Sequence, residues 1–93
     1  MYLGTNEKYD DAFALNISPN PNNGKMLVSY TLKKKSELTV VIHDSQGKQI
    51  FINNYSAEKT GSLSINLGNP SSGIYNLSIE SDGVLVTKKF VVR

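Results

Sequence analysis

The run Lys25-Met26-Leu27-Val28-Ser29-Tyr30-Thr31-Leu32 decides the fold class. Its apolar residues recur at every second position, at Met26, Val28, Tyr30 and Leu32. That spacing is typical of a β-strand, because alternate side chains of a strand point to opposite faces, whereas a helix places apolar residues three and four positions apart. The run therefore predicts a strand with one buried face, in the middle of a sheet.

Similar short runs alternate with turn signals along the rest of the chain. Pro19-Asn20-Pro21 holds two prolines, which lack an N–H donor and end a strand or a helix. Asp44-Ser45-Gln46-Gly47 has aspartate first and glycine fourth, which is typical of a type I turn in a hairpin. The predicted strands are Phe13–Ser18, Lys25–Leu32, Glu37–Asp44, Lys48–Tyr55, Leu63–Leu67, Ile74–Glu80 and Val84–Arg93. Strands this short bury one face each only against a second sheet, so we predict an all-β fold, a seven-stranded antiparallel immunoglobulin-like β-sandwich.

Length and composition indicate one domain. The 93 residues are 39% hydrophobic and 19% charged, which is ordinary for a folded domain. Residues 1–12 are polar and aperiodic, so we expect a linker or weakly ordered arm there and a folded domain over 13–93. The start of the sequence lacks the basic and apolar segments of a signal peptide, and we expect any export signal to lie elsewhere. No apolar run reaches the roughly 18 residues that predict a membrane span, so no direct membrane insertion is expected.

The sequence offers little for catalysis. Cysteine is absent, and the single histidine, His43, is expected on the outward face of a strand, where its neighbour Asp44 points the other way. The carboxylates are scattered and mostly beside turns, where charge is solvated. We therefore expect no enzyme activity, no catalytic residue, no metal site and no cofactor.

The sequence raises two binding interpretations. The basic runs Lys33–Lys35 and Lys88–Lys89 lack the interleaved aromatic or arginine side chains used to read nucleic acid, and the net charge is only +2, so no nucleic acid partner is expected. Tyr30, Tyr55 and Tyr75 are candidates for a sugar-stacking platform, although tyrosine in a sandwich is more often part of the core. A fibronectin-like or carbohydrate-binding module appended to a secreted enzyme is therefore the alternative function.

Four features follow one another in a fixed order. They are Ser18-Pro19-Asn20-Pro21 before a strand, Asp44-Ser45-Gln46-Gly47 at a hairpin, Gly73-Ile74-Tyr75 at a strand start, and Lys88-Lys89-Phe90-Val91-Val92-Arg93 on the last strand. Together they resemble, over residues 17–93, the type A C-terminal sorting domain carried by cargo of the type IX secretion system of Bacteroidota. The motif residues are Pro19, Asn20, Pro21, Asp44, Gly47, Gly73 and Tyr75. Each of them also has a reason in folding alone.

The resemblance implies a sorting signal rather than an enzyme activity. Such a domain follows a cargo protein and directs it through the periplasm and across the outer membrane, to the cell surface or the medium. The implied partners are the outer-membrane secretion machinery, a sortase that would cleave within residues 1–12, and the upstream cargo domain. We expect recognition at the terminal strand, and an edge-strand dimer is an option, because an exposed edge can pair with another sheet. The recognition residues would be Lys88, Lys89, Val91, Val92 and Arg93.

Overall fold

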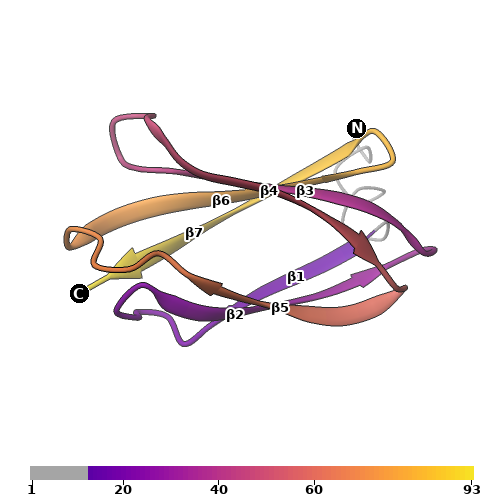
Figure 1. The fold of residues 1–93 in the computed structure, drawn as a ribbon, viewed down its shortest axis with the longest axis horizontal. Helices are drawn as coiled ribbons and strands as arrows, with labels where there is room; N and C mark the ends of the chain where they lie inside the picture. The colour runs from indigo at the N-terminus through magenta and orange to yellow at the C-terminus, as the bar shows by residue number, and fades with distance from the viewer. Residues whose placement is uncertain (1–12) are drawn as a thin grey trace, which may run out of the picture.

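The computed structural model describes residues 13–93, and in this part of the chain seven strands form two antiparallel sheets that pack face to face (Figure 1). The strands are β1 Phe13–Ser18, β2 Lys25–Leu32, β3 Ser36–His43, β4 Gln49–Ala57, β5 Thr60–Asn66, β6 Gly73–Ser81 and β7 Val84–Val92. One sheet has the order β1-β2-β5 and the other β4-β3-β6-β7. The predicted all-β, seven-stranded sandwich is confirmed. No helix among the described residues is long and apolar enough to cross a membrane.

The core lies between the two sheets and follows from the period-two pattern. In β2, β3 and β6, every second residue is buried, so one face of each strand turns away from water. The residues with no exposed surface are Val28, Leu38, Val40, Ile42, Leu77, Ile79 and Phe90. They come from both sheets, so burial of this apolar surface holds the sheets together.

Neighbouring strands explain where the strand limits differ from the sequence prediction. β3 begins at Ser36 because Ser36 pairs with Ala57, which lengthens β4 beyond Tyr55. β5 begins at Thr60 because Thr60 pairs with Thr31 of β2. These limits depend on partners far away in the sequence, and hydrophobic periodicity alone does not reveal them.

The sandwich has two ends with different contents. Figure 1 shows the β1–β2 loop, the β3–β4 turn, the β5–β6 loop and the C-terminus at one end, and the start of β1 with the remaining turns at the other. We call the first the motif end, made of residues 19–24, 44–48, 67–73 and Arg93, because the sequence motifs gather there. The second is called the far end.

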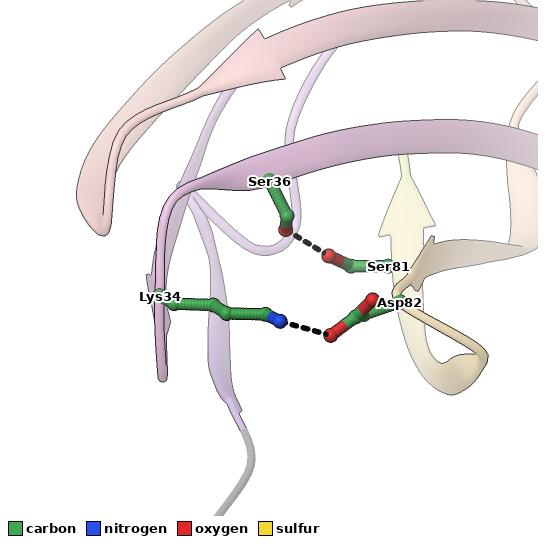
Figure 2. A network of polar contacts seen from close by, with 4 residues as sticks. All are labelled: Lys34, Ser36, Ser81 and Asp82. Atoms are coloured by element: carbon green, nitrogen blue, oxygen red, sulfur yellow. Dashed lines mark hydrogen bonds and ion pairs between the residues drawn. The ribbon is translucent and has the colours of Figure 1, made fainter.

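Polar contacts join the turns at the far end. Ser36 Oγ lies 2.5 Å from Ser81 Oγ, and Lys34 Nζ lies 3.2 Å from Asp82 Oδ2. Figure 2 shows these two contacts next to each other. Lys35 Nζ lies 3.4 Å from Glu58 Oε2. Two lysines of the Lys33–Lys35 run thus have carboxylate neighbours, which reduces their positive field.

Candidate recognition surface

β7 carries the residues expected to serve in recognition, and they divide by face. Phe90 and Val92 point into the core with 0% and 2% of their surface exposed, and Val91 is half-buried. Lys88, Lys89 and Arg93 are exposed. Of the predicted set, the three basic side chains are therefore the most open to a partner, and Val92 is closed to it.

Phe90 links β7 to the motif residue Tyr75 on β6. Their rings stack with centroids 5.5 Å apart and planes 18° from parallel, and the two residues pair directly across the strands. The Tyr75 hydroxyl donates a hydrogen bond of 2.6 Å to the Ser71 carbonyl oxygen, so the β5–β6 loop is fixed to the core through this ring.

Two asparagines of the β1–β2 loop bind the end of β7, and we call them the asparagine clasp. The Val91 N–H donates to Asn20 Oδ1 at 3.0 Å, and the Asn22 N–H donates to the Val91 carbonyl oxygen at 2.9 Å. The Arg93 N–H donates to the Asn22 carbonyl oxygen, also at 2.9 Å. Asn22 thus extends the sheet as a short parallel bridge to Val92, which closes the outer edge of β7 at residues 91–93.

Asn22 is fixed by its own loop. The residue is 7% exposed, its Nδ2 donates to the Pro19 carbonyl oxygen at 3.0 Å, and its Oδ1 accepts from the Gly24 N–H at 2.8 Å. Gly24 is required at its position, because a Cβ there would lie 2.6 Å from Cδ of Pro70 in the β5–β6 loop. The prolines, both exposed, set the shape of this loop, and their lack of N–H donors fits their place outside the ladder.

The Asp44–Gly47 motif forms the predicted turn. The Gly47 N–H donates to the Asp44 carbonyl oxygen at 3.0 Å, and the Asp44 N–H donates to the Lys48 carbonyl oxygen at 2.9 Å. Asp44 Oδ1 also accepts from the N–H groups of Gln46 and Lys48, each at 2.9 Å. Gly47 has a φ of 85°, as the left-handed position after a type I turn requires.

A groove of about 480 Å³ separates this turn from the β5–β6 loop. Its lining includes Asp44 and Lys48 from the turn and Gly73 and Tyr75 from the start of β6, and the exposed residues Ile50 and Ile74 add apolar surface. The groove thus brings together the second and third sequence motifs, which are far apart in the sequence.

The remaining candidates of the sequence do not converge. His43 is half-buried on the outer face of the sheet, and residues 13–93 contain no group of three histidine or acidic side chains that could hold a metal ion. Tyr30 and Tyr75 are core residues on different sheets, and Tyr55 is half-buried on β4. The structure therefore does not bring the three tyrosines into one exposed platform.

The asparagine clasp is the feature that the sequence did not reveal. Asn20 and Val91 are 71 residues apart, and the pattern around Asn20 indicates only a turn. The first and fourth motifs, which looked independent, are bound to each other through this contact.

Comparison with known proteins gives one family and several distant structures. The family model described as "Secretion system C-terminal sorting domain" matches residues 16–93. No curated protein matches the chain. A β-glucuronidase from Ruminococcus gnavus matches with 16% identity and a TM-score of 0.49 over 87% of this chain, which spans 15% of the length of that protein. A β-glucuronidase from Lactobacillus rhamnosus matches with 17% identity and a TM-score of 0.47, over the same shares of the two chains.

Proposed function

Because the chain belongs to the family of secretion system C-terminal sorting domains, we propose that it directs an upstream cargo protein across the outer membrane to the cell surface or the medium through the type IX system. The observation that carries this proposal is the family match over residues 16–93, which covers the whole sandwich except the start of β1. The domain has no catalytic role in this proposal, and its partners are the outer-membrane secretion and sortase machinery. The proposed cleavage linker, residues 1–12, lies outside the described residues.

In this proposal the secretion machinery recognises β7 through the exposed basic side chains of Lys88, Lys89 and Arg93. We infer a second role for the terminal residues, which is to hold the basic side chains of β7 in a fixed geometry. Three observations support it: Val92 is buried, Val91 is half-buried, and the asparagine clasp binds the backbone there. Basic side chains on a strand held in this way suit an acidic surface on the receptor.

The test uses residues 1–93 fused behind a periplasmic reporter, with its own signal peptide, in a bacterium that has a type IX system. The fusion should bring the reporter to the cell surface or medium. Replacing Lys88, Lys89 and Arg93 together by Glu should reduce this export at least about tenfold, because it reverses the charge that an acidic receptor would meet. The matched control replaces Lys33, Lys34 and Lys35 by Glu at the far end and should export normally.

The results separate two levels of the proposal. A reporter that stays in the periplasm with the unaltered domain would refute the sorting function in that host. If the unaltered domain exports its cargo and the triple variant of β7 does so equally well, sorting stands and recognition through the β7 cations is wrong. Circular dichroism of the purified variants establishes that both remain folded.

A further inference from the structure

The four-stranded sheet has two edges, β4 and β7. In an edge strand every second residue points its backbone N–H and C=O groups outward, and the hydrogen bonds show which residues these are. The N–H and C=O groups of Val91 point away from β6, because both bond to the asparagine clasp. Strand residues alternate in this respect, and β7 pairs with β6 without a register shift. Leu85, Thr87 and Lys89 therefore also present their backbone groups outward.

The same alternation can be followed across the sheet to β4. Thr87 pairs with Ser78, Ser78 with Val41, and Val41 with Ile52. Both backbone groups of a residue in an antiparallel sheet point to the same side, so Ser78 and Val41 bond to each other and Ile52 points its groups away from β3. Since hydrogen-bonded and non-hydrogen-bonded pairs alternate along each ladder, the outward residues of β4 are Ile52, Asn54 and Ser56. Short side-chain contacts agree with this phase, because Thr39 Oγ1 donates to Asn54 Oδ1 at 2.8 Å and the Ser78 and Thr87 hydroxyls lie 2.9 Å apart, as expected in closely spaced pairs.

The β7 edge is protected against pairing. Lys88 lies at an even spacing from the buried Phe90 and Val92, so its side chain starts on the same, core-facing side of this edge strand. It is nevertheless exposed. A lysine in this orientation prevents a second sheet from joining, because it would bury the ammonium group. Towards Arg93 the edge is already occupied by Asn22.

The β4 edge has no such lysine, and one of its outward donors, the Asn54 N–H, is bonded only locally, to Asn53 Oδ1 at 3.0 Å. Its nine residues, Gln49–Ala57, include no charged residue and no proline, and Ile52 on it is 56% exposed. Among residues 13–93, β4 has a strand partner on one side only, β3. Phe51 and Tyr55 are half-buried and pack against the core. An uncharged edge of this length that exposes Ile52 is the kind that pairs with another strand.

We propose that β4 is a self-association edge, on which a second copy of this chain docks antiparallel about a two-fold axis at Asn53. This arrangement places Phe51 opposite Tyr55 of the second copy, twice by symmetry, and Ile52 opposite Asn54. Aromatic cross-strand pairs are favourable, and the strand carries no charge that would repel its own copy. The inference concerns assembly and does not depend on the sorting function.

Sedimentation velocity of the full 93-residue chain, over a wide range of concentration up to the solubility limit, tests the proposal. The wild-type chain should form a dimer. Asn54→Pro removes one outward N–H from β4, and Thr87→Pro removes one from β7. Each variant also loses one exposed hydrogen bond between side chains, and Asn54→Pro in addition loses the exposed bond from the Asn54 N–H to Asn53 Oδ1, so the pair differs by this one local contact. Asn54→Pro should weaken dimerisation at least about tenfold, and Thr87→Pro should leave it unchanged.

A second pair of variants tests the register without proline. Asn53→Lys and Asn53→Glu each place like charges opposite one another at the two-fold axis, so each should be monomeric, and an equimolar mixture should regain the dimer as a heterodimer. A wild-type chain that stays monomeric, or a dimer lost in Thr87→Pro and kept in Asn54→Pro, overturns the β4 proposal. A mixture that stays monomeric overturns the register at Asn53.

Discussion

At the scale of single residues, Asn22 has the most to lose by substitution. Asn22→Ala removes a part-buried hydrogen bond to the Pro19 carbonyl oxygen and leaves the buried Gly24 N–H without its partner, so we expect the free energy of unfolding to fall by about 2 kcal/mol. Urea denaturation followed by circular dichroism measures this loss. Asn23→Ala is the control, because its exposed 3.2 Å hydrogen bond to the Lys25 N–H should contribute less than about 0.5 kcal/mol. Equal losses in the two variants would refute this role of Asn22.

Gly47 carries a second prediction at this scale. Its φ of 85° is unfavourable for a residue with a Cβ, so Gly47→Ala should lower the free energy of unfolding by about 1 kcal/mol. Gly47→Asn should retain most of the stability, because asparagine tolerates this backbone region. Nothing lies within 4 Å of a Cβ built there, so the cause would be the backbone alone. Thermal denaturation of both variants decides, and an alanine variant as stable as wild type would contradict it.

Residue-level patterns predicted the turns better than the contacts. Asp44 and Gly47 could be placed because a type I turn is decided within four neighbouring residues. The hydrogen bond between Asn20 and Val91 could not, because nothing near either residue specifies a partner 71 positions away.

At the scale of elements, Lys88 should govern whether β7 associates. Lys88→Val removes the core-facing charge from an edge strand, and we expect the variant to form larger assemblies than wild type. Lys89→Val is the matched control, because its side chain lies on the outer face and should alter assembly less. Light scattering across a concentration series compares the two, and identical behaviour would contradict the protective role of Lys88.

The strands themselves were largely predictable, and their arrangement was not. The period-two runs located all seven strands because burial of one face leaves a direct mark on the sequence. The order β4-β3-β6-β7 leaves no such mark. The sequence also does not show that the backbone N–H and C=O groups of Val91 point away from β6. The groove between the Asp44 turn and Ile74 depends on that order, so the candidate site was predictable only as separate motifs.

At the scale of the whole molecule, two polar contacts at the far end should differ in how much they stabilise the sandwich. Lys34→Ala should change the free energy of unfolding by less than about 0.5 kcal/mol, because both partners of the ion pair are more than 60% exposed, at 69% and 62%. Ser36→Ala should cost about 1 kcal/mol, because it leaves the Ser81 hydroxyl, on a residue 5% exposed, without its partner (Figure 2). Chemical denaturation at low and high salt measures both. A larger loss in Lys34→Ala would reverse this ranking.

The asparagine clasp also constrains the order in which the molecule can be completed during synthesis. A ribosome makes the β1–β2 loop early and Val91–Arg93 late, so Asn20 and Asn22 emerge long before the backbone groups that they bind. Until then Tyr75 lacks the Phe90 ring and the core lacks Val92. A nascent chain that stops within β7 therefore keeps an open sandwich with apolar surface exposed, and only a chain translated through Arg93 presents the finished motif end.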